Sequence, residues 1–194
     1  DTTGIFIMEG GDVNAPDVAL DLAKNGEGVA NFKGGTAVFG SCRTAYGDPG
    51  SGNGTINIDG DTLILEGNFR FAEYATANLN ITEGLLQVDE NLDVAQEQTG
   101  IGHIQIDGGV LEVNGLFRIG DGNGTTDINS DGTVILADSD GSERDEAFGY
   151  IQSGQMTALN GERFPLVVWD EVNEVTRITA PTDLNVAWGP DPIT

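Results

Sequence analysis

Short stretches of alternating apolar and polar residues recur along this chain, and each ends at a glycine. Clear copies are Ile56–Gly60, Leu79–Gly84 and Ile104–Gly108, and Ile128–Gly132 is a weaker copy. The glycines that end such stretches stand at positions 10, 34, 60, 84, 108, 132 and 154, so the steps between them are 22 to 26 residues. Spacing this regular predicts a structural repeat of about 24 residues.

Each repeat carries two further pairs of apolar residues. The pair Leu63/Leu65 follows a glycine, and the pair Phe69/Phe71 follows a few residues later. Side chains two residues apart on a strand point to the same side, so these pairs share one interior. Three short strands per repeat predict an all-β fold, a parallel β-helix (solenoid) of about seven coils stacked ~4.8 Å apart. A β-sandwich or jelly roll also has short, evenly spaced strands and is the alternative.

The two ends of the chain depart from the repeat. We expect residues 1–160 to form the solenoid, with residues 1–54 less regular than the rest, and residues 161–194 to form a capping hairpin and an extended tail. The hairpin spans Leu166–Thr179 with a turn near Glu171–Glu174, and it would cover the strand edges of the last coil. The segment Asp17–Gly26 fits the repeat as a strand, and a short helix is its alternative.

Composition and charge exclude several kinds of partner. The chain has 8 Lys+Arg against 32 Asp+Glu, a formal net charge of −24. This charge repels phosphates, so we expect no nucleic-acid partner. No apolar run approaches the ~20 residues of a membrane helix, so we expect no membrane insertion. The single Cys42 excludes an internal disulfide and a CxxC metal site, and the single His103 excludes a histidine cluster.

Several units resemble the repeats of secreted bacterial β-helix proteins, namely autotransporter-like passengers and planctomycete-type surface proteins. The resemblance lies in Leu79–Val94 and Ile104–Gly120, and in the closing segment Gly149–Ala158 with the hairpin that ends at Ala180. It extends from about Gly54 to Ala180. The resemblance implies an extracellular or cell-surface location and a structural, adhesive or polysaccharide-related role.

Stacked coils should place equivalent outward residues in columns along the rod. Arg70, Asp93 and Arg118 form one such column with alternating charge, which predicts a ladder of surface ion pairs. An anchor for an acidic sugar is the functional alternative for this column. A second column holds amides that could bond to one another or to glycan hydroxyls: Asn31, Asn57, Asn80, Gln105 and Asn129.

One segment resembles the opening of a calcium-binding loop. Asp127, Asn129 and Asp131 alternate and are followed by Gly132, and Asp138 stands where the closing glutamate of an EF-hand would be. Calcium is therefore the one cofactor that the sequence suggests, although such residues are also ordinary turn formers. The acidic stretch from Asp138 to Glu146 is interpreted as a solvated corner loop.

Three sequons mark possible glycosylation sites, at Asn53, Asn80 and Asn123. No pair of carboxylates stands out as a catalytic pair, and His103 has no apparent nucleophile partner, so no enzymatic activity is expected.

The function that these observations favour is an extracellular structural or adhesive protein. Exposed strand edges would let copies of the chain associate end to end into a filament or surface layer, so the expected partner is the chain itself. The candidate contact residues come from the first strand and the final hairpin: Ile5, Phe6, Ile7, Val167, Val168 and Trp169. The alternative is a polysaccharide-binding or polysaccharide-lyase-like β-helix.

Overall fold

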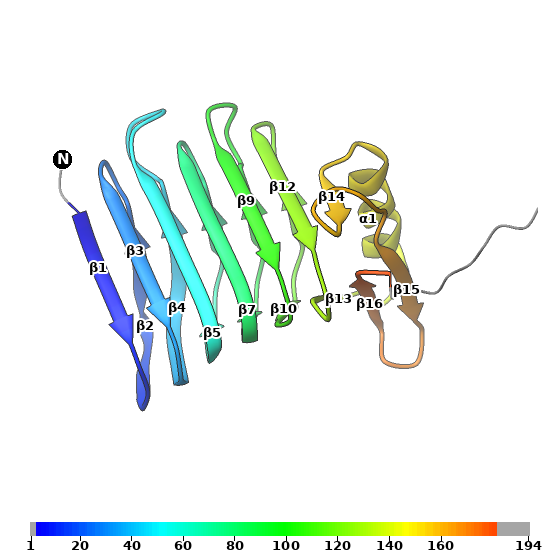
Figure 1. Cartoon of the computed structure of the whole chain (residues 1–194), viewed down its shortest axis with the longest axis horizontal. Coiled ribbons are helices and arrows are strands. Elements are labelled where there is room, and N and C mark those ends of the chain that lie inside the picture. The colour runs from blue at the N-terminus through cyan, green and yellow to red at the C-terminus, as the bar shows by residue number, and fades with distance from the viewer. Residues whose placement is uncertain (1–2, 182–194) are drawn as a thin grey trace, which may run out of the picture.

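The computed structural model describes residues 3–181 and confirms the predicted solenoid, in which about six turns of about 24 residues stack into a rod (Figure 1). The sequence predicted about seven coils, and the structure has about six turns. The tail 182–194, which was expected to be extended, lies outside the described residues. The strands are β1 (Thr3–Met8), β2 (Asp12–Leu22), β3 (Glu27–Phe32), β4 (Gly35–Thr44), β5 (Asn53–Leu65), β6 (Phe69–Phe71), β7 (Thr76–Val88), β8 (Leu92–Val94), β9 (Ile101–Ile106), β10 (Val110–Val113), β11 (Phe117–Ile119), β12 (Asn123–Ile128), β13 (Thr133–Ala137), β14 (Met156–Ala158), β15 (Leu166–Asp170) and β16 (Val175–Thr179), and the one helix among the described residues is α1 (Ser142–Gln152).

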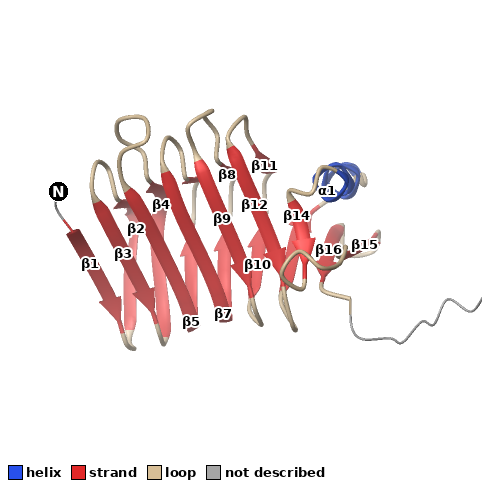
Figure 2. Ribbon diagram, turned by 45° about the horizontal axis from the view of Figure 1, so that its top comes forward, coloured by secondary structure: helices blue, strands red, loops and turns tan. Residues whose placement is uncertain are grey.

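The rod has three faces, each built from one strand segment per turn (Figure 2). Face 1 contains β1, β3, the first halves of β5 and β7, then β9, β12 and β14. Face 2 contains the first parts of β2 and β4, the second halves of β5 and β7, then β10, β13, β16 and β15. Face 3 contains the last parts of β2 and β4, then β6, β8 and β11.

The core follows directly from the alternation in the sequence. Inward residues of successive turns stack on one another, as Ile56, Leu79 and Ile104 do on face 1. All three are buried, as are Phe69 and Phe117 on face 3. Burial of each such side chain contributes about 1.5–3 kcal/mol, so the repeat itself supplies most of the stabilisation.

Two copies of the repeat were placed wrongly from the sequence. Ile128 pairs with Ile106, so Asp127, not Asn129, is the counterpart of Gln105. The coil from Ile106 to Ile128 is 22 residues long. The sequence pattern had aligned Ile128 with Ile104, and this alignment is therefore wrong by two residues. The last copy, Ile151–Gly154, belongs to the end of α1 and the turn after it rather than to a strand.

The acidic stretch after β13 is a loop only over residues 138–141, and from Ser142 onward it belongs to the helix α1, which the sequence did not predict. Asp138 accepts hydrogen bonds from the backbone N–H groups of Gly141 and Arg144 at 2.6 and 3.0 Å, and from the hydroxyl of Thr176 at 2.7 Å. Burial opposes ionisation of Asp138, but these hydrogen bonds outweigh it and lower its pKa. Asp138 therefore anchors the start of α1 to β16. This helix is too short to cross a membrane, and no other helix lies within residues 3–181.

The predicted C-terminal hairpin and the strand over residues 17–22 are confirmed. β15 and β16 pair in antiparallel fashion around residues 171–174, and β16 pairs with β13 of the last turn. β2 continues to Leu22, so the helical alternative for Asp17–Gly26 is wrong. Its apolar residues Leu20 and Leu22 stack on the strand β4 of the next turn, and this packing decides the conformation.

Candidate functional site

Charged side chains form a column along face 3. Arg70, Asp93 and Arg118 lie in register on β6, β8 and β11, as the repeat spacing predicted. The structure extends the column by two residues at its N-terminal end, because Arg43 lies beside Arg70 and Asp21 beside Arg43.

The column consists of separate ion pairs rather than a continuous ladder. Arg43 donates two hydrogen bonds to Asp21, at 3.0 and 2.6 Å, and Nε of Arg118 donates to Asp93 at 2.6 Å. Arg70 instead pairs with Glu73, with 3.7 Å between Nη1 of the arginine and Oε1 of the glutamate. These arginines are 40–49% exposed, so each pair contributes only about 0–1 kcal/mol to stability.

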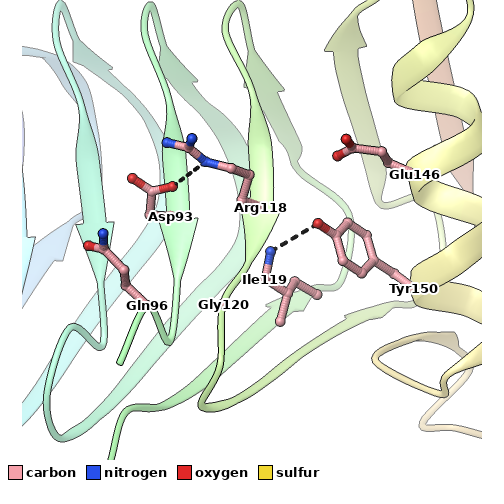
Figure 3. A pocket seen from close by; sticks show the side chains of 7 residues that line it. All are labelled: Asp93, Gln96, Arg118, Ile119, Gly120, Glu146 and Tyr150. Carbon is pink, nitrogen blue, oxygen red and sulfur yellow. Dashed lines mark hydrogen bonds and ion pairs between the residues drawn. The ribbon is translucent and has the colours of Figure 1, made fainter. Parts of the chain in front are cut away.

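A hollow of about 450 Å³ lies at the C-terminal end of this column, between β11 and α1 (Figure 3). One wall is the ion pair of Asp93 and Arg118, and the opposite wall is formed by Glu146 and Tyr150 of α1. Gln96 and the backbone at Ile119 and Gly120 complete the lining. The hollow exists because α1 takes the place that the next strand of face 3 would occupy.

Both walls of the hollow are held by hydrogen bonds. The hydroxyl of Tyr150 accepts a hydrogen bond from the backbone N–H of Ile119 at 3.1 Å. The Tyr150 ring packs edge-on against Phe117, with centroids 5.9 Å apart. Burial raises the pKa of Tyr150, so its hydroxyl stays protonated and can donate a hydrogen bond.

A second, smaller hollow of about 320 Å³ lies further along face 3. Its lining includes Arg43, Arg70, Asn68 and Glu90. Asn68 donates a hydrogen bond to the Glu90 carboxylate, so these side chains are partly engaged already. Both hollows therefore open along the same charged column.

The four candidate calcium ligands do not converge. Asp127 and Asn129 precede β13 and Asp138 follows it, so five residues of extended strand, about 16 Å, separate the two groups. Among the described residues, no group of three or more His, Cys, Asp or Glu side chains is arranged to hold a metal ion.

Asp127 and Asn129 instead fix the chain beyond the last full turn. Asp127 accepts hydrogen bonds from the hydroxyl of Thr157 and from the backbone N–H groups of Asn160 and Gly161. Asn129 accepts from the same Asn160 N–H at 2.8 Å. Asp131 is only a turn residue, with no side-chain hydrogen bond in the described part of the chain. In this structure the carboxylate of Asp127 and the amide of Asn129 therefore serve as acceptors for backbone N–H groups, and the four predicted residues do not form an EF-hand-like set of ligands.

The amide column is shorter than predicted. Asn57 donates to Asn31 at 2.7 Å, and Asn80 donates to Asn57 at 2.8 Å. Gln105 lies in register beside Asn80 but donates to Asp107, which directly follows the end of β9. The position after Gln105 is Asp127, so Asn129 does not belong to the column.

The sequons differ in their accessibility. Asn53 and Asn123 are exposed at the starts of β5 and β12, whereas Asn80 is half-buried in the amide ladder. A glycan on Asn80 would break that ladder, so Asn53 and Asn123 are the accessible candidates.

The predicted contact residues separate into two kinds. Ile5, Ile7 and Val168 are 66, 55 and 49% exposed. Phe6 packs against Phe32 and Phe39. Val167 packs against the core, and the half-buried Trp169 donates from its indole N–H to the carbonyl of Asp138, with Arg144 over its ring. Phe6, Val167 and Trp169 therefore stabilise the ends instead of presenting a contact surface.

Comparison with protein-family models, with curated proteins and with solved structures finds no match to this chain. The resemblance to secreted bacterial β-helix proteins is supported at the level of the β-solenoid fold.

Proposed function

We propose that this chain is an extracellular structural or adhesive rod that associates end to end with copies of itself. The proposed role needs no catalytic step. The observation that carries it is the distribution of exposed apolar side chains along the rod.

Exposed large apolar side chains gather at the two ends of the described structure. The first turn holds Ile5, Ile7 and Val18. The C-terminal end holds Phe148, Phe164, Leu166, Val168 and Val172, which sequence analysis largely missed because they lie outside the repeat. Between the ends, only Ile101 and Leu116 of residues 3–181 are comparably exposed. Apolar patches of this kind are typical of protein contact surfaces.

The strand edges at the two ends are compatible with a continuous sheet. Among the described strands, β2 pairs only with β4, and β15 pairs only with β16. Because β16 runs antiparallel to β13 and β15 runs antiparallel to β16, β15 has the direction of the solenoid strands. The face 2 sheet of one copy could therefore continue into β2 of the next copy as a parallel pair.

The proposed association should strengthen with ionic strength. Each copy carries a formal net charge of −24, so copies repel one another at low salt. Salt and divalent ions screen this repulsion, while the apolar contacts at the ends persist.

Light scattering and electron microscopy of the purified 194-residue chain, at low salt, at high salt and with calcium, test the proposal. We expect oligomers or fibres that grow with salt, and we expect the double substitution Ile5→Thr/Ile7→Thr to reduce them at least several-fold. The matched control is Ile101→Thr, which removes an exposed isoleucine from the middle of the rod.

A monomer under all three conditions would overturn the proposal. Equal loss of association in the end variant and in Ile101→Thr would also count against it, because apolar contacts along the side of the rod would then be responsible.

A further inference from the structure

We propose that the hollow between β11 and α1 is a binding site for neutral carbohydrate, with Arg118, Glu146, Tyr150 and Gln96 as the groups that bind sugar hydroxyls. This site goes beyond the proposed end-to-end association and does not depend on it, since its lining lies on face 3 and on α1.

The hollow offers hydrogen-bond donors and acceptors from opposite walls. Arg118 uses Nε for Asp93, which leaves the two terminal nitrogens of its guanidinium as donors. Tyr150 accepts from Ile119 and keeps its own O–H to donate. Glu146 is exposed and faces the hollow from α1, so its carboxylate can accept (Figure 3). A sugar hydroxyl both donates and accepts, and therefore suits such a mixture.

The binding groups are held before any ligand arrives. The Arg118 side chain is oriented by Asp93, which is itself buried, and Tyr150 is fixed by Ile119 and by the ring of Phe117. A preorganised site loses less side-chain entropy on binding, and this favours weakly binding polar ligands. The volume of about 450 Å³ lies within the range of small-ligand sites.

Other ligand classes fit less well. An anion in the hollow would be repelled by the Glu146 carboxylate, and the positive charge of Arg118 is already offset by its ion pair with Asp93. The net charge of −24 also repels anions from the whole rod. An apolar ligand would cover the charged side chains of both walls and leave them without water. A neutral ligand rich in hydroxyl groups avoids both costs.

The second hollow indicates that the ligand is an oligomer lying along the rod. Arg118 and Arg43 are three strand steps apart on face 3, about 14 Å by ordinary strand spacing. The hollow beside Arg43 also contains Asn68, Glu90 and Ser41, which repeat the combination of arginine, amide and carboxylate. A chain of several sugar units would reach both hollows and should bind more tightly than a monosaccharide.

Titration of the isotope-labelled chain with hexasaccharides of glucose, mannose and galactose, followed by NMR, tests the proposal. We expect at least one of them to shift the backbone amide signals of residues 118–120, with a dissociation constant in the micromolar to millimolar range. Tyr150→Phe and Glu146→Ala should each weaken this binding about tenfold. The matched control is Glu112→Ala, which removes a carboxylate from face 2 and should leave the affinity unchanged.

Thermal unfolding of each variant shows whether a loss of binding merely reflects an unfolded protein. The more conservative variant Glu146→Gln, which keeps the size of the side chain, is titrated in the same way as Glu146→Ala. Absence of binding to all three hexasaccharides would overturn the proposal. So would preferential binding of hexagalacturonate, because an acidic ligand contradicts the charge argument. The Ile5→Thr/Ile7→Thr variant should bind normally, so a failure of end-to-end association would leave this result unaffected.

Discussion

The hydroxyl of Tyr150 accepts a hydrogen bond from the backbone N–H of Ile119, a group that would otherwise point at a missing strand. Among the described strands, β11 pairs only with β8, and α1 lies on its other side. Ile119 is half-buried, and a hydrogen bond of this kind contributes about 0.5–1.5 kcal/mol net. A tyrosine side chain on a helix thus performs the task that strand pairing performs elsewhere in the solenoid.

Tyr150→Phe should lower the free energy of unfolding by about 0.5–1.5 kcal/mol, because the Ile119 N–H loses its acceptor while the aromatic packing is retained. Urea unfolding followed by circular dichroism measures the difference. Tyr74→Phe is the matched control, since no side-chain hydrogen bond of Tyr74 is present in the described structure. An equal loss in both variants would contradict the capping role.

Glu143 should make the protein less stable as the pH rises towards neutrality. Burial raises its pKa from 4.5 to about 7, with further contributions from Glu146, Asp138 and Asp140, although the backbone N–H of Phe117 opposes the shift. The folded-state pKa lies above the unfolded one, so the stabilising contribution is complete below pH 4.5 and is lost by about pH 7.

Glu143→Gln should remove this pH dependence, which amounts to about 1.4 kcal/mol for each pH unit in that interval. Unfolding free energies at pH 5 and pH 8 provide the test. We expect the wild-type chain to lose more stability between these values than the variant does, and Glu162→Gln, at an exposed position, to behave like the wild type. Identical pH profiles for all three chains would show that Glu143 does not titrate as inferred.

Asn57 should be the most sensitive residue of the amide ladder, because it donates to Asn31 and accepts from Asn80. We expect Asn57→Ala to cost about 1–2 kcal/mol in a urea titration. Gln105→Ala at the equivalent position of another turn should cost less, since the amide of Gln105 donates to Asp107 of the same turn and not to an amide of a neighbouring turn. The reverse order would argue against a stabilising ladder.

Asp127→Ala should destabilise the protein equally in calcium and in EDTA. Asp127 accepts hydrogen bonds from Thr157, Asn160 and Gly161, and these do not require a metal ion. Differential scanning calorimetry should show a lower melting temperature for the variant in both buffers. A difference that appears only in calcium would support the calcium hypothesis.

The amino-acid sequence was sufficient for the parts of this protein that depend on repetition. Every turn must place apolar residues inward at the same phase, so the stacking of Ile56 on Leu79 and the register of Arg70, Asp93 and Arg118 could be predicted from spacing alone. The hairpin was also evident, because its two apolar strands flank a short polar turn.

Only the tertiary structure decided how the last turn is closed. The partners of Asp127 and Asp138, Thr157 and Thr176, lie 30 and 38 residues further along the chain, and no local pattern connects them. A 22-residue coil moved Asn129 out of the amide column and put Asp127 in its place. The second half of the acidic run lies in α1, and this helix forms one wall of the hollow beside Arg118. Regular stacking is encoded turn by turn, whereas the cap depends on contacts between residues that are distant in sequence.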